Sequence, residues 1–143
     1  MWDKIIKWIA AAAGVIAGLY GGWGPMLTVL LVMMCIDYVT GVLVAVTGHS
    51  DKTEGGGLSS TVGFVGIAKK GVIMLIVLLA TLLDRAIGNT TLIFQSATVC
   101  YYIANEGLSI LENADLLHIP TPKFIHERLE VMRDKGDKPP DGE

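Results

Sequence analysis

The stretch MLTVLLVMMCIDYVTGVLVAVT, residues 26–47, decides the fold class of this chain. Asp37 is its only charged residue, and the remainder is almost entirely apolar. A helix rises about 1.5 Å per residue, so a segment of this length crosses a hydrocarbon core of about 30 Å. A carboxylate near the middle of a membrane span is unfavourable, and its presence predicts a specific partner and a role for Asp37.

The composition of the whole chain places it in the membrane class. Of its 143 residues, 52% are hydrophobic and only 17% are charged, against roughly 25% charged residues in ordinary soluble domains. The net charge is −3, and the Lys and Arg residues are scattered rather than gathered on one face. Both features argue against a nucleic-acid partner.

No group of residues predicts an enzyme, a cofactor or a metal site. The two cysteines, Cys35 and Cys100, lie in separate apolar segments without CxxC spacing, which favours small packing residues over a disulfide. The three histidines, His49, His118 and His126, lie in loop or tail and lack the spacing of metal ligands. We therefore expect no catalytic, cofactor-binding or metal-binding residue.

Further apolar segments flank the opening stretch and predict an all-α integral membrane protein with about four transmembrane helices. The Gly21–Pro25 break separates the first two segments, and Ser59 with Ser60 is expected to cap the third. The spans predicted from these signals cover about residues 5–20, 26–47, 61–83 and 91–111. They form a membrane domain over residues 1–117, which a cytoplasmic segment over residues 118–143 follows.

The basic residues predict that both chain ends are cytoplasmic. With four spans, Arg85 is the one basic residue outside, a strong positive-inside bias. If the first segment lay flat or stayed outside, giving three spans, Lys4 and Lys7 would move to the wrong side. A second alternative is that the N-terminal segment is a cleavable signal.

Small residues mark two helix faces as candidates for packing or oligomerisation. In the first segment Gly14 and Gly18 belong to a four-residue repeat of small side chains from Ala10 to Gly22, which allows close approach of another helix. That helix belongs either to the same chain or to a second copy. In the second segment Gly41 and Ala45 share the helix face of the aspartate.

An intramembrane polar pair is predicted between Asp37 and either Lys69 or Lys70. If the second and third segments form an antiparallel hairpin, all three side chains lie about 12 to 15 Å from its loop. An ion pair at that depth, within one chain or between copies, would lower the unfavourable free energy of the charges. The alternative is an interfacial helix over residues 58–70 whose lysines reach the headgroups.

Polar residues in the fourth segment form an edge at its cytoplasmic end, made of Asn105, Glu106, Ser109 and Asn113. They either line water or mark the point where the helix leaves the bilayer.

The last segment predicts a short amphipathic helix. Thr121 is expected to cap it with Pro122 as its first residue, and one face then carries Ile125, Leu129 and Met132. This helix rests either on the membrane or on the bundle. Residues 136–143 are rich in proline and charge, which predicts disorder.

The chain resembles the toxin-secretion/phage-lysis holins from about residue 25 to the prolines at 120–122. The resemblance is carried, in order, by DYVTG at 37–41, LSS at 58–60, GIAKK at 66–70, NE at 105–106 and SILEN at 109–113. It implies a phage or prophage protein of the host bacterial cytoplasmic membrane, multi-pass, whose partners are lipids and further copies of itself. Such a protein opens lesions through which an endolysin or a toxin crosses, without necessarily touching it, and has no catalytic residues.

Three other functions stay open. A small channel or transporter would use Asp37 and Glu106 to line an ion or proton path. An antiholin would share the fold and block the lesion. A membrane scaffold would bind a partner through residues 114–143.

Overall fold

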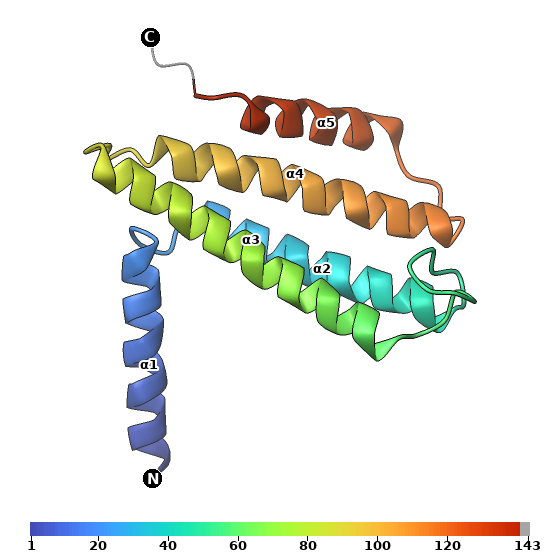
Figure 1. Ribbon diagram of the computed structural model, residues 1–143, viewed down its shortest axis with the longest axis horizontal. Helices are drawn as coiled ribbons and strands as arrows, with labels where there is room; N and C mark the ends of the chain where they lie inside the picture. The colour runs from blue at the N-terminus through green and yellow to red at the C-terminus, as the bar shows by residue number, and fades with distance from the viewer. Residues whose placement is uncertain (141–143) are drawn as a thin grey trace.

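The computed structural model describes residues 1–140, and within that range all regular structure is helical. Five helices follow one another along the chain (Figure 1). They are α1 (Trp2–Leu19), α2 (Pro25–Val46), α3 (Ser60–Ala86), α4 (Ile93–Leu116) and α5 (Lys123–Asp137).

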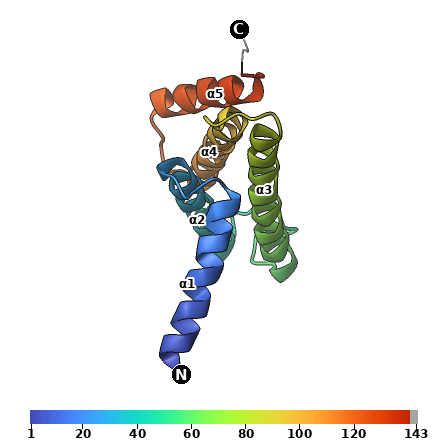
Figure 2. The same ribbon diagram turned by 90° about the vertical axis from the view of Figure 1, so that its left-hand side faces the viewer.

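Helix α4 is the centre of the molecule. It lies between α5 on one side and the pair α2 and α3 on the other, and α2 and α3 each pack on α4 more than on one another (Figure 2). The core forms where these helices meet, around Leu30, Val77, Val99 and Ile103. Because α4 is covered on both sides, it contains more buried residues than any other described helix.

Helix α1 projects transversely from this body and is attached at its C-terminal end (Figure 1). None of its residues is buried. The following Tyr20 is buried, and its hydroxyl donates a hydrogen bond to the carbonyl of Met74 at 2.9 Å. Arg85 donates to the carbonyl of Gly18 at 2.5 Å. The end of α1 is therefore fixed to α3, while its other turns meet no other helix extensively.

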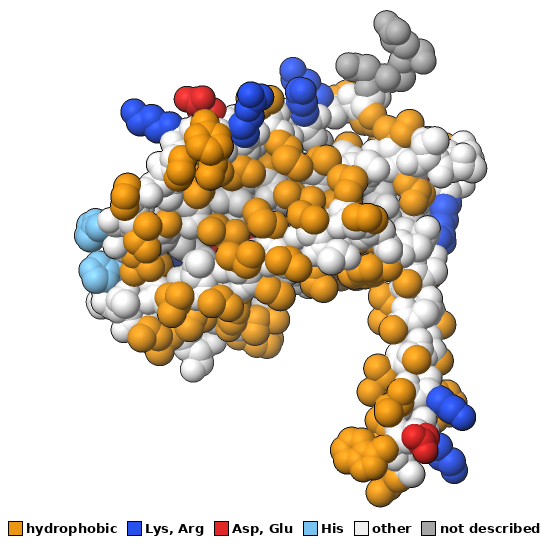
Figure 3. All heavy atoms as spheres, turned by 180° about the vertical axis from the view of Figure 1, so that it is seen from behind, with side chains coloured by type: hydrophobic (Ala, Val, Ile, Leu, Met, Phe, Trp, Pro, Cys, Tyr) orange, Lys and Arg blue, Asp and Glu red, His pale blue; other side chains and the backbone are white. Residues whose placement is uncertain are grey.

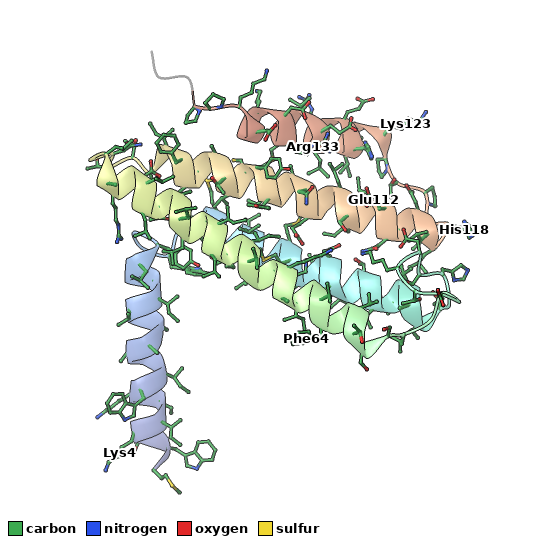
Figure 4. The ribbon with its side chains drawn as sticks, in the orientation of Figure 1. Lys4, Phe64, Glu112, His118, Lys123 and Arg133 are labelled. Carbon is green, nitrogen blue, oxygen red and sulfur yellow. The ribbon has the colours of Figure 1, made fainter. Side chains whose placement is uncertain are left out.

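Two described helices, α2 and α3, are long and apolar enough to cross a membrane. Their outer faces expose large apolar side chains, and Phe64 on α3 points away from α4 (Figure 4). Helix α1 carries three charges near its start, and α4 contains buried polar residues. The spans at 5–20 and 91–111 and the orientation of the chain stay predictions.

The third predicted segment forms one uninterrupted helix. The hydroxyl of Ser59 accepts a hydrogen bond from the amide of Val62 at 3.4 Å, which confirms the predicted cap. Helix α3 continues through Lys69 and Lys70. The alternative of a separate helix over residues 58–70 is therefore wrong, and the location of its lysines relative to the membrane stays a prediction.

Two predictions for the last segment are also wrong. Helix α5 begins at Lys123, because Pro122 has extended backbone angles, and no side chain caps it. Gly136 and Asp137 are helical rather than disordered, because the contact of Gly136 with α4 holds this end of α5 in place. Of the two locations expected for the amphipathic helix, α5 takes the one on the bundle. Residues 141–143 lie outside the described residues.

Candidate functional site

A group of charged side chains joins α2, α3 and α4 near the middle of the body. The ammonium nitrogen of Lys70 lies 2.7 Å from Oδ2 of Asp37 and also donates a hydrogen bond to Oε2 of Glu106. One lysine from α3 therefore joins carboxylates from the two neighbouring helices. These residues, together with Asn113 and Thr40, are called the inner cluster below.

The side chain of Asn113 completes the inner cluster from α4. Its amide nitrogen donates to Oδ1 of Asp37 at 3.2 Å and to the hydroxyl of Thr40 at 2.9 Å. That hydroxyl in turn donates to the backbone carbonyl of Ile36 at 2.9 Å. Both oxygens of the Asp37 carboxylate thus have donors, each from a different helix.

The inner cluster is largely shielded from solvent and contains one more negative than positive side chain. The side chains of Asp37 and Lys70 are 15% and 17% exposed, and that of Glu106 is 6% exposed. Two carboxylates share one ammonium group, and no second Lys or Arg within residues 1–140 lies within 4.0 Å of either one. Removing the lysine would leave two carboxylates unpaired, which is strongly unfavourable in a low dielectric.

A cavity of about 370 Å³ lies beside the inner cluster, between α2 and α3. Asp37, Lys70 and Glu106 line it, and the exposed side chains of Lys52 and Lys69 line it as well. Because the cavity extends to the loop that joins α2 to α3, it gives the charged groups a route toward that end of the molecule.

The structure brings some of the predicted site residues together and separates others. Lys69 faces the cavity, with no carboxylate of the described residues within 4.0 Å of its ammonium group. In the polar edge of α4, Asn105 is exposed and Ser109 half-buried, and both line the cavity, whereas Glu106 and Asn113 are buried.

Of the four predicted packing residues, two lie against other parts of the chain, and the side-chain positions of the other two meet no neighbouring helix. Gly41 faces α4, because a Cβ atom added there would lie 3.8 Å from the side chain of Asn113. Ala45 is half-buried along the cavity. In contrast, a Cβ atom added at Gly14 or Gly18 would meet nothing within 4 Å. The small face of α1 is therefore unoccupied within one described chain.

Sequence reasoning missed a second buried polar group at the other end of the body, called the outer cluster below. The carboxylate of Asp84 is fully buried at the end of α3. Its Oδ1 accepts from the side chain of Asn89 at 2.8 Å and from the amide of Phe94 at 3.1 Å, and its Oδ2 accepts from the amide of Gln95 at 2.8 Å. Asp84 therefore caps the start of α4 from the preceding helix.

Gln95 links the outer cluster to the start of the chain. Its amide nitrogen donates to the carbonyl of Tyr20 and to the hydroxyl of Thr81, both at 2.7 Å. Helix α4 begins after Leu92 with no capping side chain of its own, so its first amides need an acceptor from elsewhere. Asp84 is too far before this helix start in the sequence for an N-cap pattern to reveal it.

The described residues hold no cluster of three His, Cys, Asp or Glu side chains suited to a metal ion. Cys35 and Cys100 are free thiols. The rings of His49 and His118 contact one another edge to face, with centroids 6.0 Å apart. This contact joins the loop after α2 to the end of α4.

Two apolar helices of membrane-crossing length, packed around a buried ionic cluster, are consistent with the class of small helical membrane proteins. The sequence profile of the bacteriophage holin family matches residues 14–134, which include α2, α3, α4 and most of α5. The chain belongs to this family. The resemblance seen in the sequence is thereby confirmed.

Several individual relatives match most of the chain, and one of them is a phage protein with a holin name. The chain is 37% identical over 131 residues to the uncharacterized 14.9 kDa protein in the nagH 3′ region of Clostridium perfringens, covering 91% of this chain and 94% of the relative. It is 36% identical to an uncharacterized protein of Halalkalibacterium halodurans, covering 95% and 98%. It is 35% identical to a probable holin of Bacillus phage phi105, covering 78% and 77%. No solved structure matches the chain.

Proposed function

We propose that this protein is a holin that collects at the host cytoplasmic membrane, crosses it as a multi-pass protein, assembles with copies of itself and opens lesions that release an endolysin. Membership of the holin family supports the class of function. The observation that carries the mechanism is the inner cluster, in which Lys70 joins Asp37 and Glu106 from three different helices.

The inner cluster supplies a physical basis for a closed state. At membrane depth each separated charge is unfavourable by at least about 2.5 kcal/mol, so the three side chains hold α2, α3 and α4 together. If these helices separate while several copies associate, the same groups turn toward water. Because water then replaces the lost partners, the charged faces stabilise a hydrated opening that a single closed chain cannot form.

The small face of α1 is proposed as one contact between copies. Gly14 and Gly18 are open in the described chain, and small side chains allow two helices to approach closely in a bilayer. The proposed arrangement keeps both chain ends in the cytoplasm, with α1 and α4 crossing in addition to α2 and α3. Lipids and other copies are its direct partners, and no catalytic step or cofactor is assigned.

Inducible expression in a bacterium tests the proposal, with and without a cell-wall hydrolase that lacks a secretion signal. Membrane potential and the release of hydrolase activity are recorded together. A holin produces sudden depolarisation followed by hydrolase release and lysis. Depolarisation with the hydrolase retained would instead identify a small channel or transporter. An unchanged membrane potential would contradict lesion formation and favour an antiholin or a scaffold.

A matched pair of variants connects this assay to the inner cluster. Lys70→Met removes the shared cation, and Lys69→Met removes the neighbouring lysine, which has no ion-pair partner among the described residues. At equal amounts of membrane-inserted protein, the first variant should change the time of depolarisation and the second should leave it nearly unchanged. Equal timing for both would contradict the role of the inner cluster.

A further inference from the structure

Helix α5 lies against α4 in very close contact. An added Cβ atom at Gly136 would lie 2.7 Å from the amide nitrogen of Tyr101 and 2.8 Å from the carbonyl oxygen of Ala97. Farther along, Leu129 fills the space over Gly107, where an added Cβ atom would lie 2.9 Å from its side chain. The two helices are therefore antiparallel, and α5 covers the greater part of α4 (Figure 1).

The surface of α5 away from α4 is highly charged. Its charged side chains gather along the edge of the molecule that α5 forms (Figure 3), and two of them, Lys123 and Arg133, are labelled in Figure 4. Helix α5 carries Lys123, Glu127, Arg128, Glu130, Arg133, Asp134, Lys135 and Asp137, of which Glu130 and Arg133 are half-buried and the others are exposed. It also exposes two apolar side chains, Phe124 and Val131. The ion pairs that α5 forms within the described residues are exposed ones on α5 itself, so its charged face requires water.

The opposite side of the body is apolar. Across α4 from α5, the outer faces of α2 and α3 expose large hydrophobic side chains, among them Val39, Leu43, Leu75 and Leu79. Helix α1 projects from this side, away from α5 (Figure 2). The molecule is thus layered, with the charged surface of α5 on one side of α4 and the apolar surface of α2 and α3 on the other.

This layering conflicts with a spanning arrangement of the same helices. Helix α5 lies beside α4 along the same length over which α4 lies beside α2 and α3. If those three helices crossed a bilayer, docked α5 would lie at the depth of the hydrocarbon core with its charged face toward lipid. Charges in that position are strongly unfavourable. Docked α5 and a membrane-spanning α4 therefore exclude one another.

We infer that α5 is a releasable cover of α4. With α5 docked, the molecule lies at the membrane surface, with the outer faces of α2 and α3 toward lipid and the charged face of α5 toward water. Release of α5 uncovers α4, which then crosses the bilayer with α2 and α3. This inference rests on the proposed holin function, because it makes the release of α5 the step that precedes lesion formation.

A cysteine pair tests the docked state in cells. In a chain with Cys35→Ser and Cys100→Ser, the pair G107C and L129C places two thiols at facing positions of α4 and α5. The control pair combines L129C with E112C, at an exposed position of α4, so that L129C is present in both pairs. A short membrane-permeant bis-methanethiosulfonate should link the first pair before lysis and not the second. Equal linkage of the two pairs would overturn the docked state.

The same linked protein tests the release step. Linked G107C/L129C protein should fail to depolarise the cells until a reductant cleaves the link, while the control pair lyses on schedule. Depolarisation on schedule with the link intact would overturn the need for release. A third outcome is that the facing pair links, but neither the reduced protein nor the natural sequence ever depolarises cells. That result would confirm the docked helix and refute both the holin function and the role of release in it.

A substitution that prevents docking gives an independent measurement. Gly136→Ala forces a Cβ atom into the backbone of α4, and it also raises the helix propensity of α5, so loss of docking cannot be ascribed to a melted helix. In the cysteine-pair background it should lower the G107C/L129C linkage, and in the natural sequence it should advance depolarisation. The control Lys135→Ala, at an exposed neighbouring position, should change neither. Unchanged linkage in Gly136→Ala would contradict the docking contact.

Discussion

The inner and outer clusters both bury a carboxylate among the helices, but they satisfy it in different ways. In the outer cluster Asp84 has no exposed surface and receives all of its hydrogen bonds from backbone amides and one side-chain amide. In the inner cluster Asp37 depends on an ammonium group and an amide from two other helices. One carboxylate is held by a helix terminus and the other by a shared cation.

The difference indicates which part of the molecule can open. The partners of Asp84 lie within the turn between α3 and α4 and the first residues of α4, so they stay nearby whenever that turn remains folded. The partners of Asp37 are far away in the sequence. Separating α3 or α4 from α2 breaks the inner cluster while the outer cluster still joins α3 to α4.

Loss of the shared cation should produce the largest effect on stability. Lys70→Met leaves the carboxylates of Asp37 and Glu106 unpaired, and we expect a loss of about 3 kcal/mol or more in the free energy of unfolding. Denaturant titration of the purified protein in a mild detergent, followed by circular dichroism, measures this loss. Lys69→Met is the control and should change the free energy by less than about 0.5 kcal/mol.

A double-mutant cycle sharpens this prediction. Adding Asp37→Asn to Lys70→Met should recover part of the lost stability, because one unpaired charge is removed along with its partner. Strictly additive effects of the two substitutions would show that Asp37 and Lys70 are not coupled. The inner cluster would then not differ from the outer cluster in being held by an ion pair.

Loss of the buried cap should have the next largest effect. Asp84→Ala leaves the amides of Phe94 and Gln95 without their acceptor, and we expect a loss of about 2 kcal/mol. Once expression is matched, the time of depolarisation should hardly change, since the outer cluster stays closed in the proposed mechanism. Glu112→Ala, at an exposed position of α4, is the control for stability. A large shift in the time of depolarisation from Asp84→Ala would contradict the proposal that only the inner cluster opens.

Removal of the amide in the inner cluster should have a smaller effect. Asn113→Ala deletes the donor to Asp37 and Thr40 but leaves the lysine in place, so we expect a loss of about 1 kcal/mol. The exposed Asn105→Ala is its control. If Asn113→Ala destabilised the protein as much as Lys70→Met, the amide rather than the cation would dominate the inner cluster.

The smallest expected effect belongs to the edge of the outer cluster. Thr81→Val preserves shape and removes one acceptor of Gln95, which still donates to the carbonyl of Tyr20. We expect a loss of about 0.5 to 1 kcal/mol, measured in the same titration, with exposed Thr61→Val as the control. A loss above that of Asp84→Ala would mean that Gln95, not the cap, holds this end of the molecule.

Part of the inner cluster was predictable from residue counting. In an antiparallel hairpin, depth depends only on the number of residues from the loop, so Asp37 and both lysines fall at one level. The choice of Lys70 over Lys69 depends on the rotation of α3 about its axis, since neighbouring residues on a helix point in directions about 100° apart. That rotation is set by how α3 packs on α4, as is the recruitment of Glu106 and Asn113.

The outer cluster and the docking of α5 show the limits of local patterns. Asp84 acts on amides of the next helix across a turn, and the turn geometry that permits this is not evident from composition. In α5 the charges of the last residues predict disorder around Gly136, yet the missing side chain of that glycine lets the backbone of α5 reach the backbone of α4. A contact between distant segments thus overrode the local preference.

The sequence by itself determined the class of the protein, the apolar helices of membrane-crossing length, the Ser59 cap and membership of the holin family, because these depend on composition, on hydropathy along the chain and on residues adjacent in sequence. The tertiary structure alone decided that Lys70 serves two carboxylates, that Asp84 caps α4 and that α5 covers α4. These contacts depend on which helix faces meet, and helix faces are chosen by the packing energy of the whole body rather than by any one segment.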